Sequence, residues 1–187
     1  MNSPHSTSLF EGRKLQAQQD PKCSPPPFGG VRGGLEAAGL LFLSLGSNLG
    51  DRAANLRAAL TLLQEEVGTL LAVSSFIDTA PVDMASPHRF LNAVAAFRTT
   101  LSPARLLAVT QDIERRLGRT EKSHDGQHPD RTIDIDILLL GDFRVDNEEV
   151  IPGHRLTIPH PLMYERDFVM RPLREVQKKL TEHDSPL

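Results

Sequence analysis

The segment Arg131–Ile137 reads Arg-Thr-Ile-Asp-Ile-Asp-Ile, and this alternation constrains the fold more than any other stretch of the chain. Side chains of a β-strand point alternately to its two faces, so the three isoleucines share one face while Asp134 and Asp136 share the other. We therefore predict a strand over Thr132–Leu140 whose isoleucine face packs against a core.

The two aspartates of this strand are the first indication of chemistry. Their Cα atoms would lie about 7 Å apart on one face, where like charges repel each other. Aspartate is also uncommon in strands, which favours a site for a hard cation. Two carboxylates completed by water and phosphate oxygens are a usual environment for Mg²⁺. A solvated strand face without a ligand is the alternative, and the motif alone leaves it open.

The other elements follow from hydrophobic spacing and turn residues. They are a strand over Leu41–Leu45, a helix from Asp51 to Gly68, strands over Leu70–Thr79 and Phe90–Thr100, and a helix from Ser102 to Gly118. The order β-α-β-β-α-β predicts an α+β class, namely a ferredoxin-like sandwich with helices packed on one face of an antiparallel sheet. A short hairpin and one or two small helices are expected in Asp142–Val176.

Proline and glycine divide the chain into three parts. They crowd residues 1–39, where no helical or strand period is visible, so we predict a disordered extension there. The folded domain is expected over residues 40–176, with a flexible tail over 177–187.

Composition excludes several classes of protein. The 21 Lys and Arg against 24 Asp and Glu give a net charge of −3, which speaks against a basic nucleic-acid binder. No apolar run approaches the roughly 20 residues of a membrane span. The single cysteine excludes a disulfide framework and fits a reducing compartment, so a cytoplasmic protein is expected. A monomer is a separate expectation.

Further polar residues suit phosphate binding, although each has a structural alternative. The turn Gly46–Gly50 lies between a strand and a helix but lacks the Lys-Ser/Thr of a P-loop. His160, between two prolines, could donate to a phosphate or act as an acid, or could be a structural loop histidine. Arginines near the ends of segments could recognise phosphate or simply be surface residues; they are Arg119, Arg131, Arg155 and Arg166.

Four segments together closely resemble the 6-hydroxymethyl-7,8-dihydropterin pyrophosphokinase family. They are Gly46–Arg52, Phe90–Ala93, Asp130–Leu138 and Leu156–His160. The resemblance covers about residues 41–176. It implies an enzyme (EC 2.7.6.3) of folate synthesis in which the pterin hydroxymethyl oxygen attacks the β-phosphorus of ATP and AMP leaves. The partners implied are these two small molecules alone.

The resemblance also implies a role for each site residue. Asp134 and Asp136 would hold two Mg²⁺, with Arg119 and Arg131 as further catalytic residues. Pterin binding would involve two ring-stacking phenylalanines, two polar side chains and a nearby backbone, namely Phe90, Phe168, Asn92, Thr79 and Val82. Nucleotide binding would involve Gln111, Glu114, Ile137, Arg155, Thr157, His160 and Arg166. We expect Gln111 and Glu114 on the exposed side of their helix. Without the resemblance, core packing would be the preferred interpretation of the two phenylalanines.

The chain departs from the family in the loop before the aspartate pair. Members often carry a tryptophan and more arginines there, whereas Glu121–Asp130 has neither. Closure over ATP would then fall to Lys122, His124 or His128, or would be less complete. Two rival interpretations remain. A ferredoxin-like RNA-binding module would need exposed aromatics among basic residues, which the 5% aromatic content does not favour. A degenerate member that binds without turnover is the other.

Overall fold

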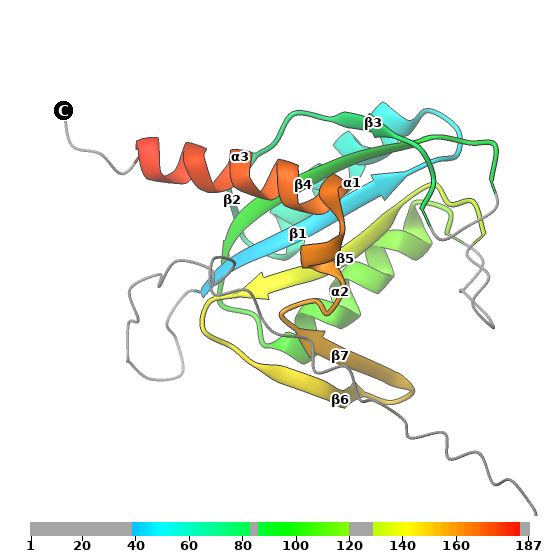
Figure 1. Cartoon of the computed structure of the whole chain (residues 1–187). Helices are drawn as coiled ribbons and strands as arrows, with labels where there is room; N and C mark the ends of the chain where they lie inside the picture. The colour runs from blue at the N-terminus through cyan, green and yellow to red at the C-terminus, as the bar shows by residue number, and fades with distance from the viewer. Residues whose placement is uncertain (1–38, 83–85, 120–128, 184–187) are drawn as a thin grey trace, which may run out of the picture.

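The computed structural model describes residues 39–82, 86–119 and 129–183 (Figure 1). The elements in chain order are β1 (Gly39–Ser47), α1 (Arg52–Glu66), β2 (Thr69–Val73), β3 (Ile77–Thr79), β4 (Phe90–Thr99), α2 (Pro103–Arg116), β5 (Asp134–Leu140), β6 (Val145–Ile151), β7 (His154–Ile158), the short 3-10 helix η2 (Met163–Glu165) and α3 (Asp167–His183). The predicted disordered extension lies outside the described residues, except for Gly39 at the start of β1.

The main sheet has the strand order β2-β4-β1-β5, and β3 also pairs with β4. All of these pairings are antiparallel. This order is that of a split β-α-β arrangement, so the predicted ferredoxin-like α+β class is confirmed. The single strand expected over Leu70–Thr79 is instead two, β2 and β3. Between them the Ser74 side chain accepts a hydrogen bond from Val94 N at 3.0 Å, which holds the interrupted segment against β4.

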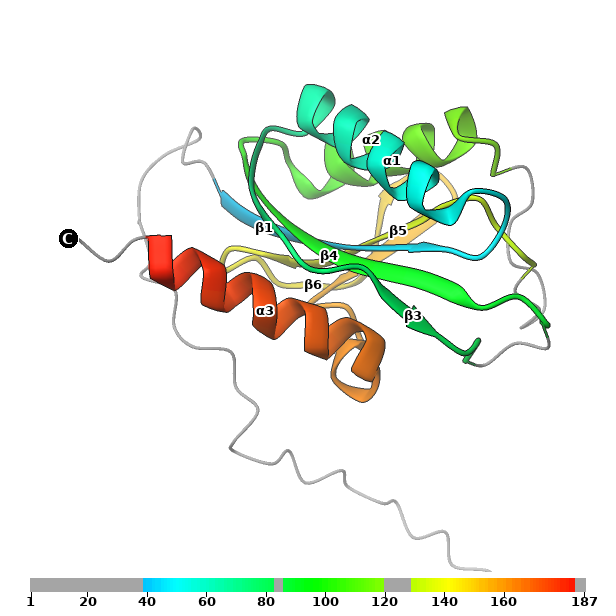
Figure 2. The same cartoon turned by 90° about the horizontal axis from the view of Figure 1, so that it is seen from above.

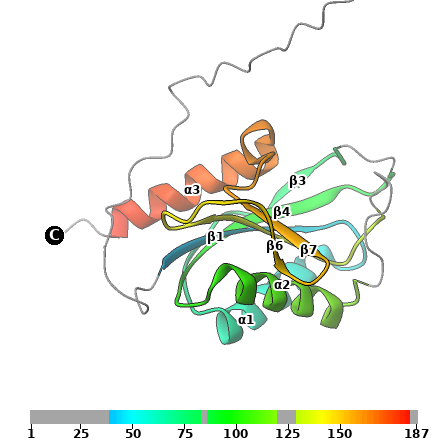
Figure 3. The same cartoon turned by 90° about the horizontal axis from the view of Figure 1, so that it is seen from below.

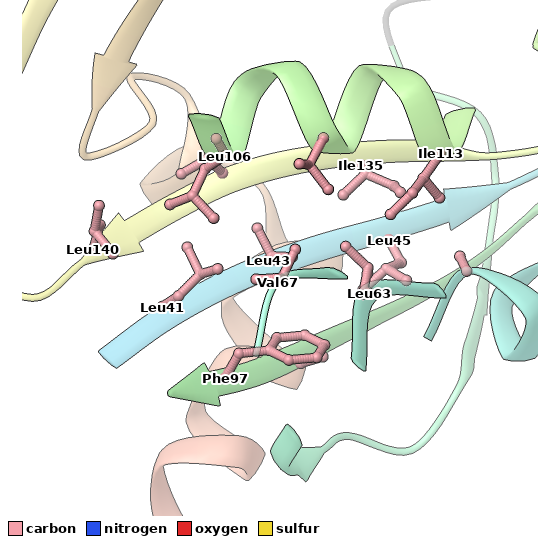
Figure 4. Packing of buried hydrophobic residues seen from close by; sticks show 14 of the residues in the cluster. Leu41, Leu43, Leu45, Leu63, Val67, Phe97, Leu106, Ile113, Ile135 and Leu140 are labelled. Carbon is pink, nitrogen blue, oxygen red and sulfur yellow. The ribbon is translucent and has the colours of Figure 1, made fainter. Parts of the chain in front are cut away.

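Helices α1 and α2 cover one face of the sheet (Figure 2). The predicted caps begin both helices: Asp51 accepts from Ala54 N and Ser102 accepts from Arg105 N. The core beneath them is formed by alternate residues of three strands and one side of each helix, including Leu41, Leu43, Leu45, Phe97, Ile135, Leu63, Leu106 and Ile113 (Figure 4). The isoleucine face of β5 therefore packs as predicted.

Helix α3 covers the opposite face, which corrects the expectation of helices on one face only (Figure 2). Its residues Val169, Leu173 and Val176 pack against apolar positions of β1, β4 and β5. The reason is that these strands are apolar on both faces, so both need a cover. The same helix runs to His183, so residues 177–183 are helical and the expected flexible tail over 177–187 is wrong for that part.

Strands β6 and β7 form the expected hairpin, which lies beside β5 and α2 (Figure 3). It is followed by η2 and then by α3, which at 17 residues is not one of the small helices expected. Among the described residues, no helix combines the length and the apolar character that crossing a membrane requires.

Candidate active site

The sheet face under α3 is apolar only where the helix lies on it. Further along the same strands and on the same face, the positions become small or polar: Ser44 and Gly46 on β1, Asn92 on β4, and Asp134 and Asp136 on β5. A pocket opens at this place. It is lined by Ser44, Gly46, Thr79, Ala80, Val82, Phe90, Asn92, Arg131, Asp134, Asp136, Arg166 and Phe168. Nine of the predicted site residues are thus brought together.

Small neighbours on β1 make room above the acidic pair. Asp136 is paired with Ser44 and Asp134 with Gly46 in the β1–β5 register. A Cβ atom at Gly46 would stand 3.0 Å from Asn92 Oδ1 and 3.6 Å from the Phe90 ring. Glycine at this position therefore keeps the floor of the pocket open.

The two carboxylates have different environments. Asp134 forms ion pairs with Arg119 and with Arg131, whose Nη2 lies 2.9 Å from Asp134 Oδ2. The Asp136 side chain accepts no hydrogen bond within the described part of the chain, and burial together with the charge of Asp134 raises its pKa to about 7. An unpaired carboxylate beside a second one is a setting in which a bound cation is favourable.

The donor set fits Mg²⁺ only with help from a ligand. Over residues 39–82, 86–119 and 129–183, no group of three or more His, Cys, Asp or Glu side chains is placed to hold a metal ion. Mg²⁺ commonly takes one or two carboxylates and completes its shell with water and substrate phosphates. The Asp134–Asp136 pair matches that pattern rather than an all-protein cage.

Glu114 does not lie where it was expected. We placed it on the exposed side of α2, whereas it is 8% exposed, faces β5 and accepts a hydrogen bond from Ile135 N at 2.7 Å. It also pairs with Arg119, the arginine that reaches Asp134. Burial and the nearby Asp134 charge raise the Glu114 pKa to about 7. Glu114 therefore supports the site from behind the strand.

Two aromatic rings stand next to arginines at the pocket wall. The Arg131 guanidinium lies 5.5 Å from the centre of the Phe90 ring, and that of Arg166 lies 5.7 Å from the Phe168 ring. Such spacing allows a cation–π contact. Near Phe90 on β4, Asn92 Nδ2 donates to Thr79 Oγ1 of β3 at 2.8 Å, which fixes the amide on the pocket floor.

The remaining predicted residues lie outside the pocket lining. Gln111 Nε2 contacts His154 Nδ1 at 2.9 Å, which joins α2 to β7. Arg155 Nε donates to Asn147 Oδ1, and Thr157 Oγ1 accepts from Asn147 N, so both belong to the hairpin. The Ile137 side chain is 4% exposed in the core under α1 and α2, so it cannot contact a ligand.

His160 is partly buried next to the site. Its Nδ1 accepts a hydrogen bond from Leu162 N at 3.3 Å. Burial and then the charge of Arg166 lower its pKa, so the ring is neutral at pH 7 and its proton is on Nε2. It can donate one hydrogen bond toward an anion.

Ser44 and Ala80 also line the pocket and were not singled out in the sequence. Ser44 breaks the apolar run of β1 and lies next to Asp136, a signal that strand alternation could have supplied. The loop residues proposed to close over ATP, Lys122, His124 and His128, fall outside the described residues.

Comparison with known proteins finds relatives of this chain. The profile described as 7,8-dihydro-6-hydroxymethylpterin-pyrophosphokinase (HPPK) matches residues 42–178. The chain is 52% identical over 138 residues to a 2-amino-4-hydroxy-6-hydroxymethyldihydropteridine pyrophosphokinase of Porphyromonas gingivalis, covering 73% of this chain and 90% of that one. Identity to the enzyme of the same name from Bacillus subtilis is 43% over 138 residues, covering 73% and 77%.

Larger proteins contain a similar unit. A crystal structure of wild-type Plasmodium falciparum HPPK-DHPS with STZ-DHP superposes with a TM-score of 0.58 at 14% identity, covering 78% of this chain and 43% of that one. At such identity the likeness shows the fold alone. The matched part is less than half of that longer protein.

Proposed function

The chain belongs to the 7,8-dihydro-6-hydroxymethylpterin-pyrophosphokinase family, and on that premise we propose that the pocket on the α3 side of the sheet is its active site. As a member of this family it transfers pyrophosphate from ATP to 6-hydroxymethyl-7,8-dihydropterin and releases AMP, a reaction of folate synthesis. One observation carries the assignment of the site: the acidic pair and the aromatic and amide side chains line a single pocket.

The pterin end of the proposed site is formed by Phe90, Phe168, Asn92, Thr79 and the backbone near Val82. A flat heterocycle between two aromatic rings gains stacking and burial of apolar surface. Because Asn92 Nδ2 is engaged by Thr79, Asn92 Oδ1 is left to accept from an amino group of the pterin.

The phosphate end is formed by the acidic pair and the arginines around it. We propose that Asp134 and Asp136 hold two Mg²⁺, which would neutralise charge on the ATP phosphates. We propose that Arg119, Arg131 and Arg166 bind phosphate oxygens, which guanidinium groups suit because they donate in a fixed fork. Since Arg119 and Arg131 pair with Asp134 in the free protein, nucleotide binding would redistribute these contacts.

The chemical step needs positioning more than proton chemistry. A bond forms between the pterin hydroxymethyl oxygen and the β-phosphorus as the hydroxyl proton passes to water, and the bond from that phosphorus to the α–β bridging oxygen breaks, so AMP leaves with the electron pair. The side chains at the two ends hold the nucleophile and the phosphorus in line, and the arginines stabilise the negative charge that spreads over the phosphoryl oxygens.

The nucleoside side is proposed at α2 and the hairpin. Gln111, Arg155 and Thr157 lie there, His160 follows the hairpin, and these four residues would contact ribose or base. Glu114 is proposed to hold Arg119 rather than to touch the nucleotide, because its carboxylate already accepts hydrogen bonds from Arg119 Nη1 and from the backbone N–H of Ile135. For Ile137 we propose a nucleotide contact through its main chain alone, because its side chain is buried.

Two further expectations stay proposals. The first is that the protein is a monomer. The single cysteine supports a reducing compartment such as the cytoplasm.

Incubation with ATP, Mg²⁺ and 6-hydroxymethyl-7,8-dihydropterin tests the assignment. We expect AMP from the wild type and none from Asp134→Ala or Asp136→Ala, both with an unchanged circular dichroism spectrum. Asp142→Ala, at an exposed turn, is the control and should turn over normally. Full turnover in either pocket variant would refute the metal assignment, and pterin binding without AMP in the wild type would favour the degenerate member.

A further inference from the structure

Asp130 lies outside the pocket lining, yet its carboxylate joins three segments of the chain. Asn48 Nδ2 and Ser86 Oγ each donate to Asp130 Oδ1 at 2.6 Å, and His88 Nδ1 pairs with Asp130 Oδ2. Hydrogen bonds from Ser86 and His88 lower the Asp130 pKa, so the group is ionised at neutral pH. We call Asp130, Asn48, Ser86 and His88 the Asp130 cluster.

One arm of the Asp130 cluster fixes Arg131. Asn48 is 3% exposed, and its Oδ1 accepts from Arg131 N at 2.8 Å while its own N–H donates to Arg131 O at 3.1 Å. The turn after β1 thus holds the backbone of Arg131 from both sides. The Arg131 side chain then reaches Asp134 at 2.9 Å, at the phosphate end of the pocket.

The other arm holds the segment that enters β4. His88 stands two residues before Phe90, and its N–H donates to Ser86 Oγ at 3.0 Å, so both residues are tied to Asp130 and to each other. The next carbonyl, that of Arg89, accepts from Arg52 Nη1 at 2.9 Å. The backbone leading into Phe90, at the pterin end, is therefore fixed on both sides.

These two arms meet inside the pocket, where the Arg131 guanidinium stands 5.5 Å from the Phe90 ring. We propose that Asp130 is a positioning residue that sets the pterin end of the pocket relative to the phosphate end. The proposal rests on the pterin and phosphate ends assigned above. In-line transfer depends on that relative placement, and small misplacements of reactants are costly in rate.

The test compares Asp130→Ala with Glu175→Ala. Glu175 is a matched control because it also accepts three hydrogen bonds, from Ser75 N at 2.9 Å, Ser75 Oγ at 3.0 Å and Lys179 Nζ at 2.9 Å, and joins distant segments away from the pocket. For Asp130→Ala we expect the KM for the pterin to rise about tenfold and kcat to fall. The KM for ATP should change less than about twofold, because both hydrogen bonds between Asn48 and the Arg131 backbone remain in this variant. Both variants should lower Tm by a similar amount, whereas Glu175→Ala should leave both KM values unchanged.

His88→Ala provides a milder test that does not depend on the folding of Asp130→Ala. It should raise the KM for the pterin by about threefold. The double variant His88→Ala/Asp130→Ala should have the same KM for the pterin as Asp130→Ala alone, because both changes remove the same contact. Equal increases of both KM values, or a lowered Tm with an unchanged KM for the pterin, would overturn the inference. A wild type that makes no AMP would instead overturn the proposed function.

Discussion

Replacing Asp136 by asparagine should stabilise the metal-free protein while abolishing its activity. Burial and the charge of Asp134 raise the Asp136 pKa from 3.8 to about 7, which means that the folded state disfavours the ionised carboxylate. One pKa unit corresponds to about 1.4 kcal/mol, so the ionised group costs the native state at most about 4 kcal/mol above pH 7. Because the side chain keeps some contact with solvent, we expect a gain of about 2 kcal/mol from Asp136→Asn.

The sign of the pH dependence follows from the same shift. Between pH 4 and 7 the folded state holds a proton on Asp136 that the unfolded state releases, so this group lowers the free energy of unfolding as the pH rises. Thermal unfolding with a chelator should therefore show Asp136→Asn melting about 8 °C above the wild type at pH 8. The difference should shrink at pH 5, where the wild-type carboxyl is protonated.

The control for this comparison is Asp142→Asn, at an exposed position for which no difference between pH 5 and pH 8 is expected. Mg²⁺ with ATP should raise the Tm of the wild type but much less that of Asp136→Asn, because the variant lacks a metal ligand. An Asp136→Asn protein less stable than the wild type at pH 8, or equally shifted at both pH values, would refute the reasoning.

Two glycine substitutions should have distinct effects, one on the KM for the pterin and the other on the free energy of unfolding. Gly46→Ala places a Cβ 3.0 Å from Asn92 Oδ1, so the KM for the pterin should rise about tenfold in steady-state assays with little change for ATP; an unchanged KM would show that the pterin does not reach this floor. Gly68→Ala has φ +148° and a Cβ 2.2 Å from Arg98 O, so urea unfolding should report a loss of about 3 kcal/mol while both KM values stay the same; a loss below about 1 kcal/mol would contradict the strain argument.

Local periodicity and turn residues were sufficient to predict the β-α-β-β-α-β order of elements along the chain and the acidic pair. In β5 the alternation of isoleucine and aspartate determines which side chains face the core, and no tertiary information is needed. The face covered by α3 was missed because the domain was ended at residue 176, although Val169, Leu173, Val176 and Leu180 recur at helical spacing.

The prediction that Glu114 lies on the exposed side of α2 is wrong. Glu114 lies one helical turn after the buried Thr110, so spacing alone places it on the buried side of α2. A glutamate is rarely buried without a partner, and the partner, Arg119, is supplied only by the fold. The Asp130 cluster could not be predicted for the same reason, because its members are separated by up to 82 residues.

A crystal structure of the protein with Mg²⁺, 6-hydroxymethylpterin and a non-hydrolysable ATP analogue would show whether one pocket holds both substrates. We predict the pterin ring between Phe90 and Phe168, its polar edge at Asn92, and the β-phosphate joined through Mg²⁺ to Asp134 and Asp136. A pterin bound elsewhere, or phosphates away from the two aspartates, would contradict this prediction.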